Sequence, residues 1–412
     1  MRRNLTRSLV GGIIPAIVGI AGTLIAVNYV DSNGKLSLLL AWTVLGYLTL
    51  TDFGLTRSAS KIASSRDAST TDLLAVLWRI SIPLGILVTL VLFVAIFVSK
   101  GGSVLYFLLP VPLLSALQFP LIGILEARGS FGYLAGQRSA NSVASFLAPA
   151  ILVSIAPSYL PLALALISVA RFVMLMALGA RVRLSALETA RATFGKHRYS
   201  ALESKSVVPW LALSSLVGPI LLYADRFVLA TGFISNDLWV YYAATSEILL
   251  KSYILPTALV AVWFPWLAAN ARHHLDKVRK RFLIWLPAIT VIAAIAGGLT
   301  AYFIFPDAIF HLLGAEPEWM QTARMVLSIT FAATIVNWSS QLYIALLQAL
   351  DAQKFVGLMQ LAILLPFILA LVASAAAVGA VLVAVVYLLR IVIVWLGLLG
   401  RSALSLRHST NG

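Results

Sequence analysis

Long apolar runs recur along the whole chain, and they constrain the fold more than any other feature. A run of about 20 apolar residues spans the hydrocarbon core of a bilayer as a helix. Such runs follow one another from Leu9 to Leu399, with short polar connections between them. Only 11% of the 412 residues are charged, whereas soluble proteins carry about 25%. The sequence therefore predicts an all-α polytopic membrane protein without a soluble domain of useful size.

The apolar runs divide into about twelve expected transmembrane helices. In chain order they are Leu9–Val30, Leu36–Leu55, Leu74–Val98, Val104–Leu125, Ala140–Ala156, Leu162–Ala180, Val207–Thr231, Leu238–Leu267, Phe282–Phe305, Ala323–Leu346, Leu358–Ala377 and Val378–Leu399. A polar stretch separates the sixth run from the seventh. We therefore expect a six-helix bundle over residues 1–195, a cytoplasmic linker at 196–206, a second six-helix bundle over 207–400 and a cytoplasmic tail at 401–412.

The basic residues are distributed in a way that orients the chain in the membrane. Lys and Arg gather in alternate short loops and at both ends, whereas the intervening loops carry only Lys35 and Lys100. Cytoplasmic loops of membrane proteins have such an excess of positive charge. We therefore assign the net charge of +15 to membrane orientation, with no nucleic-acid partner and both termini in the cytoplasm. Both halves then begin inside, as parallel repeats do.

Ionisable residues lie inside the two spans of the stretch Trp210–Pro265. Asp225 and Arg226 lie in the seventh span, and Glu247 and Lys251 in the eighth. A charge in a span costs roughly 2.5–3.5 kcal/mol, so these side chains should face each other or a water-filled cavity. Residues four apart share a helix face, which pairs Glu247 with Lys251. Consecutive residues point about 100° apart, so Asp225 and Arg226 cannot share one partner on a single face.

Two interpretations of these charges stay open at this point. They form either a salt-bridge cluster that pins the seventh span to the eighth, or a polar wall for an ionic substrate or a coupled ion. Arg171 and Arg390 lie near the middle of the sixth and twelfth spans, where they suit an anion that enters between the halves. Snorkelling, or pairing with helix-end carbonyls, is the alternative for both arginines. Asp52 and Arg57 border the cytoplasm and form either a local helix cap or a cytoplasmic gate.

Several classes of chemistry lack the residues that they need. The chain has no cysteine, which excludes disulfides, thiol chemistry and Cys-ligated metals. The histidines lie in loops or near span ends, and we expect no metal. There is no Walker A sequence, so direct use of ATP is not expected. These absences favour a transporter over an enzyme and predict no cofactor, with coupling to H⁺ or Na⁺ left open.

Three motifs carry a resemblance to a known family. The first is Tyr223-Ala224-Asp225-Arg226-Phe227 followed by Tyr241-Tyr242, Glu247, Lys251, Pro256 and Phe264-Pro265. The others are Asp52-Phe53-Gly54-Leu55 with Arg57, and Leu125-Glu126-Ala127 with Phe131. Together they resemble the bacterial polysaccharide (O-antigen) flippases of the multidrug/oligosaccharidyl-lipid/polysaccharide exporter superfamily. The likeness in length, span count and charge pattern extends over the whole chain.

The resemblance implies a function and a set of partners. It implies a two-bundle transporter of the MATE-like fold in the bacterial inner membrane, working as a monomer by alternating access. Such a protein moves an undecaprenyl-diphosphate-linked oligosaccharide between leaflets for surface polysaccharide biosynthesis, beside membrane lipid and polysaccharide polymerase machinery. The residues expected to bind the diphosphate are Arg226, Lys251, Arg171 and Arg390. Asp225 and Glu247 would neutralise these cations or carry the coupling ion.

Two other functions remain as alternatives to the flippase. A cation-coupled multidrug exporter of the same superfamily would favour an acidic, aromatic cavity, whereas basic residues exceed acidic ones inside these spans. A membrane-embedded glycosyltransferase or polysaccharide polymerase would need a large periplasmic loop or a pair of catalytic carboxylates. Neither feature is evident in the sequence, so the flippase is the favoured prediction.

Overall fold

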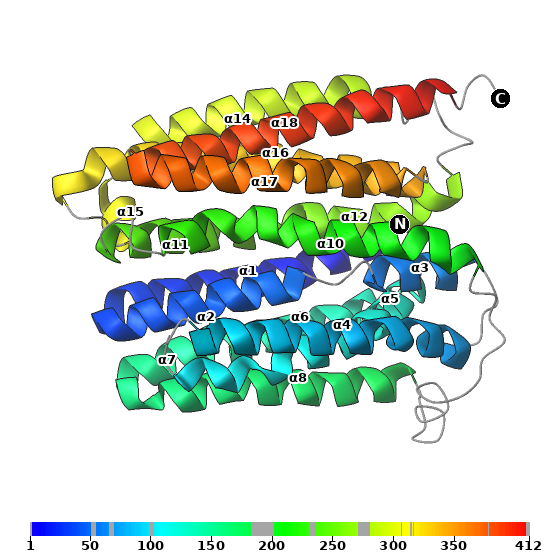
Figure 1. The fold of residues 1–412 in the computed structure, drawn as a ribbon, viewed down its shortest axis with the longest axis horizontal. Helices are drawn as coiled ribbons and strands as arrows, with labels where there is room; N and C mark the ends of the chain where they lie inside the picture. Colours follow the sequence, from blue (N-terminus) through cyan, green and yellow to red (C-terminus); the bar gives the residue numbers. More distant parts are fainter. Residues whose placement is uncertain are drawn as a thin grey trace. The chain divides into compact units, whose positions relative to one another are not determined.

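Every element in the described part of the protein is a helix (Figure 1). The computed structural model describes residues 2–50, 55–65, 70–98, 103–182, 202–230, 236–270, 281–305, 307–313, 315, 317–350, 352–377 and 379–408. Within these residues, nine helices are long and apolar enough to cross a membrane. Each expected span coincides with one helix or with two or three consecutive helices. The predicted all-α polytopic architecture is therefore confirmed.

The chain divides into two compact units. Unit 1 comprises Met1–Gly22 and Leu40–Leu216, and unit 2 comprises Thr23–Leu39 and Val217–Gly412. The outer part of the first helical hairpin thus belongs to unit 2, and Asn28 Nδ2 donates a hydrogen bond to the Leu312 carbonyl at 3.0 Å. The expected boundaries of the two bundles stay a prediction.

Unit 1 is built around one central helix, α5. Its described helices are the first part of α1 (Arg2–Tyr29), the second part of α2 (Ser32–Leu50), α3 (Leu55–Ser65), α4 (Thr70–Val98), η1 (Ser103–Leu108), α5 (Pro110–Ala127), α6 (Phe131–Ser142), η2 (Val143–Leu147), α7 (Ala148–Ile155), η3 (Pro157–Tyr159), α8 (Leu160–Val182) and the first part of α10 (Leu202–Leu229). Helix α5 packs against α3, α4 and α8. The core of this unit includes Leu55, Leu74 and Leu178, none of which is exposed. A strongly apolar helix that is surrounded by other helices is expected at such a central position.

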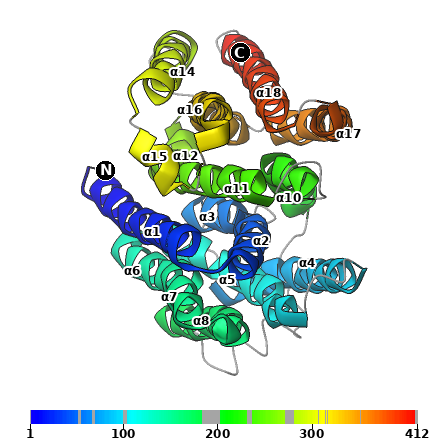
Figure 2. The ribbon, with the colours of Figure 1, turned by 90° about the vertical axis from the view of Figure 1, so that its left-hand side faces the viewer.

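Unit 2 is built around α16 in the same way. Besides the facing ends of α1 and α2, its described helices are the second part of α10, α11 (Asn236–Lys251), α12 (Ile254–Asn270), η4 (Arg281–Trp285), α14 (Leu286–Phe303), α15 (Asp307–Leu312), η5 (Pro317–Trp319), α16 (Met320–Ala349), α17 (Gln353–Ala377) and α18 (Ala380–His408). Helix α16 packs against α11, α12, α14 and α18, as Figure 2 shows. The central helices α5 and α16 correspond to the fourth span of each half of the chain.

The eighth span is interrupted, although the sequence predicts one continuous helix over Leu238–Leu267. Helix α11 ends at Lys251 and α12 begins at Ile254. Pro256 has no N–H to donate to the carbonyl of Ser252, four residues earlier. That carbonyl instead accepts a hydrogen bond from the Leu255 N–H at 3.0 Å, which makes a tight turn. The prediction of an unbroken helix was therefore wrong.

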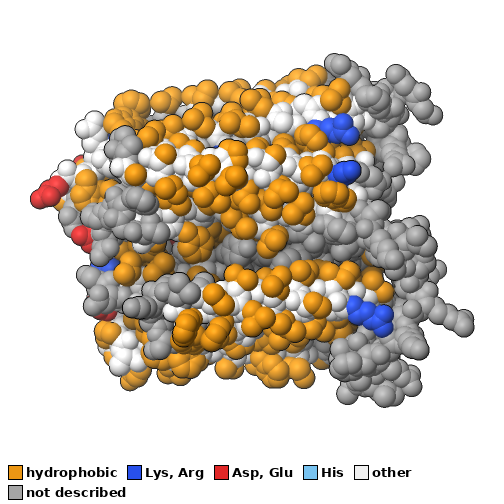
Figure 3. All heavy atoms as spheres, in the orientation of Figure 1, with side chains coloured by type: hydrophobic (Ala, Val, Ile, Leu, Met, Phe, Trp, Pro, Cys, Tyr) orange, Lys and Arg blue, Asp and Glu red, His pale blue; other side chains and the backbone are white. Residues whose placement is uncertain are grey.

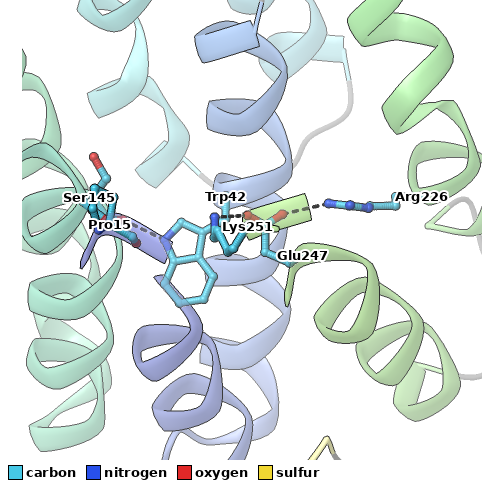
Figure 4. Close-up of polar contacts among 7 residues, drawn as sticks. Pro15, Trp42, Ser145, Arg226, Glu247 and Lys251 are labelled. Atoms are coloured by element: carbon cyan, nitrogen blue, oxygen red, sulfur yellow. Dashed lines mark hydrogen bonds and ion pairs between the residues drawn. The ribbon is translucent and has the colours of Figure 1, made fainter. Parts of the chain in front are cut away.

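The fifth span begins earlier than predicted and contains an irregular turn. The sequence predicts a loop over Glu126–Ser139. In the structure, helix α6 already begins at Phe131 and carries the polar side chains of this segment. Gly129, with φ of 69°, makes the turn that ends α5. The π-helical turn η2 then widens the helix at Val143–Leu147. The indole of Trp42 is fully buried beside it and donates a hydrogen bond to the Ser145 carbonyl at 2.9 Å (Figure 4).

The long sides of the helices are covered with apolar side chains, and charged side chains lie near the ends (Figure 3). Leu90, Phe97, Ile292 and Leu365 are among the large apolar residues that are more than half exposed. Exposed apolar surface on this scale is costly in water and favourable in lipid. The described helices therefore belong to a multi-pass membrane protein.

Candidate functional site

One buried carboxylate, that of Glu247, bridges two cations in unit 2. Its Oε2 accepts a hydrogen bond from Arg226 Nη1 at 2.8 Å, and its Oε1 forms an ion pair with Lys251 Nζ (Figure 4). The side chains of Arg226 and Glu247 are 2% and 3% exposed. The predicted pairing of Glu247 with Lys251 is confirmed. A salt bridge between the seventh and eighth spans was one of the two interpretations that the sequence left open. In the structure, Arg226 of α10 forms this salt bridge with Glu247 of α11.

Asp225 has a partner of its own, as its angular separation from Arg226 predicts. The Tyr242 hydroxyl donates a hydrogen bond to Asp225 Oδ2 at 2.6 Å. Asp225 Oδ1 is buried and has no hydrogen-bond partner among the described residues. An unpaired carboxylate oxygen in an apolar environment is costly, because the charged group has lost its water. Asp225 is therefore a carboxylate that can still take up a proton, a water molecule or a cation.

Aromatic groups complete the environment of Arg226. Its guanidinium lies over the ring of Tyr223, with Cζ 4.7 Å from the ring centroid. The indole of Trp239 donates a hydrogen bond to the Arg226 backbone carbonyl at 3.2 Å. A cation over an aromatic face is stabilised without being neutralised. These contacts fix the guanidinium beside Glu247, and Arg226 Nε is left without a hydrogen-bond partner in the described part of the chain.

A small cavity lies next to these charges within unit 2. Helices α10, α11, α16 and α18 contribute its lining, which consists of Leu222, Asp225, Arg226, Ser246, Leu249, Leu250, Thr330, Thr334 and Tyr387. The hydroxyls of Thr330 and Thr334 donate to carbonyls of their own helix, at 2.7 Å to Val326 and 2.8 Å to Thr330. Their oxygens keep lone pairs that can accept further hydrogen bonds. The cavity lining thus combines polar and apolar side chains.

Arg390 and Arg171 are the other buried cations that the sequence singles out. Arg390 is 7% exposed, and its guanidinium contacts the rings of Phe367 and Tyr387, with 5.0 and 4.8 Å from Cζ to the ring centroids. Arg171 belongs to unit 1 and is also 7% exposed. Its backbone carbonyl accepts a hydrogen bond from Gln118 Nε2 at 2.5 Å. The buried position of both arginines rules out the snorkelling alternative.

The sequence-predicted site is brought together only in part. In unit 2 the structure gathers Asp225, Arg226, Glu247 and Lys251 into one cluster. The proposed gate cannot be described in the same way, because Asp52 lies outside the described residues. Arg57 lies on α3, where it is half-buried.

Some site residues were missed by sequence reasoning. Tyr242, Tyr387, Thr330 and Thr334 were not assigned to the site, although all four contact it. A signal existed for the threonines, because residues four apart in a span lie on one face of the helix. For Tyr387 the only signal was a lone tyrosine three residues before Arg390, which is too common a pattern to single out.

Comparison with known proteins identifies the fold. No family model matches the chain. A Shigella flexneri protein named "Putative O-antigen transporter" is 25% identical over 165 residues, a match that covers 39% of this chain and 37% of that protein. The matched region is therefore well under two thirds of the relative's length.

Solved structures match the chain over nearly its whole length. A MATE protein in complex with MaL6 has a TM-score of 0.72 at 12% identity and is covered over 97% of its chain, with 99% of this chain aligned. An outward-facing multidrug resistance MATE family transporter of the MOP superfamily has a TM-score of 0.71 at 14% identity, with 96% of it and 99% of this chain aligned. A MOP superfamily transporter from Pyrococcus furiosus, described as having a binding pocket of reverse polarity, gives 0.68 at 14% identity, with 95% and 99% aligned. The chain therefore has the fold of the MATE transporters.

Proposed function

We propose that this protein is a flippase that moves a polyprenyl-diphosphate-linked oligosaccharide across the bacterial inner membrane by alternating access. The observation that carries the proposal is the excess of buried cations at mid-span. Arg171, Arg226 and Arg390 are each at most 7% exposed, and Lys251 is nearly buried. Within unit 2, the carboxylates beside Arg226 and Lys251 are Asp225 and Glu247. Ionisable groups inside spans commonly mark the pathway of a substrate or an ion.

A diphosphate is the part of such a substrate that needs these cations. It carries several negative charges, which cannot enter an apolar cavity without cationic partners. Arginine binds phosphate oxygens through parallel N–H groups, and lysine binds them as a point charge. The polyprenyl tail can remain in the bilayer while the charged and sugar parts pass through the protein. Asp225 and Glu247 keep the empty site near neutrality, and either one is placed to carry a coupling H⁺ or Na⁺.

Two comparisons support the proposal. The Shigella flexneri relative bears the name of an O-antigen transporter, and its matched region is similar in sequence to part of this chain. The Pyrococcus furiosus protein has the same fold and a pocket described as having reverse polarity. A single fold hosts different substrates, so the charge of the site is the better guide to the substrate.

A multidrug exporter is the second candidate. It is favoured by the MATE multidrug transporters of the same fold and by the open Oδ1 of Asp225 in the small cavity. A cationic drug would approach that carboxylate. It would also meet Arg226 in the same cavity wall, and a nearby like charge opposes its binding.

The proposal is tested by leaflet translocation in proteoliposomes. The probe is a fluorescent polyprenyl-diphosphate oligosaccharide, and Arg226→Ala and Lys251→Ala are compared with the wild-type protein. The control is Arg401→Ala, which removes an exposed arginine of α18. Transport by the wild type and the control, with loss in the two folded variants, would support the flippase. A wild-type protein that ignores this probe but extrudes a cationic dye would establish the drug exporter instead.

A further inference from the structure

The cations of unit 2 differ in how far they are already neutralised. Glu247 binds both Arg226 and Lys251. Asp225 is a second carboxylate, and it directly precedes Arg226 in α10. The two carboxylates therefore balance these two cations in formal charge. Arg390 forms no ion pair with a carboxylate among the described residues. It is the buried cation of this cluster that lacks a dedicated counterion.

The unpartnered atoms of Arg390 form one edge of its guanidinium. Nε and Nη2 are both buried and both lack a hydrogen-bond partner in the described part of the chain. The N–H groups of these two nitrogens point in the same direction from a rigid plane. Such an edge matches two oxygens of one phosphate, which accept two parallel hydrogen bonds. The open edge has the geometry of an oxyanion site.

The surroundings of Arg390 hold this edge in place without satisfying it. The rings of Phe367 on α17 and Tyr387 on α18 contact the guanidinium. Aromatic rings stabilise a cation but leave its charge in place. Two buried, unsatisfied donors on a charged group are costly, and an apolar residue would fill the same volume more favourably. This cost is offset if a negatively charged ligand accepts hydrogen bonds from Arg390 during part of the transport cycle.

Tyr387 connects this site to the cavity described above. Its ring contacts Arg390, and the same residue lines the cavity beside Asp225 and Arg226. Tyr387 therefore lies in contact with both Arg390 and the cavity. The neighbouring Asp225 carboxylate also acts on Arg390 electrostatically, and it would repel the same ligand when charged.

Unit 1 repeats this feature at the equivalent place. Arg171 lies on α8, 11 residues after its first residue Leu160, and Arg390 lies 10 residues after Ala380, the first residue of α18. Both are 7% exposed, and in both Nε has no described hydrogen-bond partner. Each unit therefore holds a buried arginine with an unpartnered Nε, within its described residues.

We infer that Arg390 holds two oxygens of a substrate phosphate through Nε and Nη2, whereas Arg226 and Lys251 are held by Glu247. The inference rests on the proposed function, because it names the residue that contacts the diphosphate directly. A phosphate group can also come from an anionic phospholipid, which offers the same oxygens. The experiment therefore includes both sources.

The test compares Arg390→Lys and Arg390→Met with the wild-type protein. Arg390→Lys keeps the charge but loses the edge with two parallel donors. The control is Arg401→Lys on the same helix, where the exposed arginine lies over the ring of Phe355. Binding of inorganic diphosphate to purified protein is measured by calorimetry, transport is measured in proteoliposomes, and thermal unfolding reports on the fold.

We expect Arg390→Lys to weaken diphosphate binding about tenfold or more, the effect of losing one good charged hydrogen bond. Arg390→Met should weaken it further without lowering the unfolding temperature, because an unpaired buried charge has been removed. The control should bind as the wild type does. A fall in unfolding temperature for both Arg390 variants, in proportion to their loss of binding, would show a structural role and overturn the inference.

Other outcomes separate the inference from the proposed function. Unchanged diphosphate binding and transport in both Arg390 variants would overturn the inference and leave the flippase intact. A wild-type protein that neither binds diphosphate nor transports the lipid-linked probe would overturn both. Phosphatidylglycerol vesicles that displace diphosphate from the wild type, but not from Arg390→Met, would assign the edge to a membrane lipid and overturn its role in substrate binding.

Discussion

Glu247 holds two cations with one carboxylate, and this makes it the most sensitive residue of the cluster. Its replacement by Gln removes the charged carboxylate that binds both Arg226 and Lys251 and leaves these two like charges close together. Breaking a buried ion pair from one side costs about 3–5 kcal/mol. We predict that Glu247→Gln lowers the unfolding temperature by several degrees and abolishes transport. Thermal unfolding in detergent, with Glu318→Gln at an exposed position as the control, checks this.

A Glu247→Gln protein that unfolds at the wild-type temperature would contradict the bridging role. If that variant also transported its substrate at the wild-type rate, a coupling role for Glu247 would be excluded as well. Retained stability with lost transport would instead separate the two roles and leave proton or cation coupling as the function of this carboxylate.

The bond from Tyr242 to Asp225 gives a second prediction at the residue scale. Tyr242→Phe removes the hydroxyl that donates a hydrogen bond to Asp225 Oδ2 at 2.6 Å. An orphaned buried acceptor costs roughly 1–3 kcal/mol. We expect a lower free energy of unfolding for Tyr242→Phe and no change for Tyr159→Phe, whose ring is 43% exposed. Equal stability of the two variants would show that Asp225 does not depend on Tyr242.

The site could be predicted from the sequence where helix geometry alone decides the contact. The Glu247–Lys251 pair follows from a spacing of four, and the separate partners of Asp225 and Arg226 follow from adjacency. The partner of Arg226 on another helix depends on how α10 packs on α11. The sequence carries no direct signal for this packing. The aromatic partners of Arg390 depend on packing in the same way.

At the scale of the element, hydropathy predicted the helices and missed their irregularities. A run of apolar residues reports length and position, and each expected span indeed falls on helix. The π-helical turns η2 and η4 and the turn at Ser252–Tyr253 change hydrogen bonding without changing composition. Helix α6 was missed at its start because a polar helix in the membrane interface has the composition of a loop.

The break between α11 and α12 lies directly after Lys251, and it gives a prediction for Pro256. Pro256→Ala restores an N–H that can reach the Ser252 carbonyl and close the helix. Interrupted helices in transporters tend to lie at binding sites. We predict that Pro256→Ala slows transport while the unfolding temperature stays the same or rises. Initial rates in proteoliposomes check this, with Pro366→Ala in α17 as the control because its proline side chain is exposed.

Transport by Pro256→Ala at the wild-type rate would show that the interruption is only a local accommodation of proline. If Pro366→Ala lost as much of the transport rate as Pro256→Ala does, any proline in these helices would be needed. Only a difference between the two variants assigns a role to the turn beside Lys251.

At the scale of the whole molecule, the absence of cysteine allows a direct test of orientation. Arg401 lies near the basic end of α18, and Glu318 lies just before α16 in an acidic segment; both are exposed. We predict that a membrane-impermeant maleimide labels Glu318→Cys in intact cells, and labels Arg401→Cys only after permeabilisation, because basic loops stay in the cytoplasm. The reverse labelling pattern would show that the protein has the opposite orientation in the membrane.

The hydrogen bond between Asn28 and the Leu312 carbonyl joins residues 284 positions apart. A ribosome that adds about 5–20 residues per second completes Leu312 roughly 14 s or more after Asn28. During this time the hairpin at Thr23–Leu39 has left the ribosome, but the unit to which it belongs is not yet made. The segment Thr23–Leu39 is therefore synthesised well before Leu312, the residue to which Asn28 is bound in the finished protein.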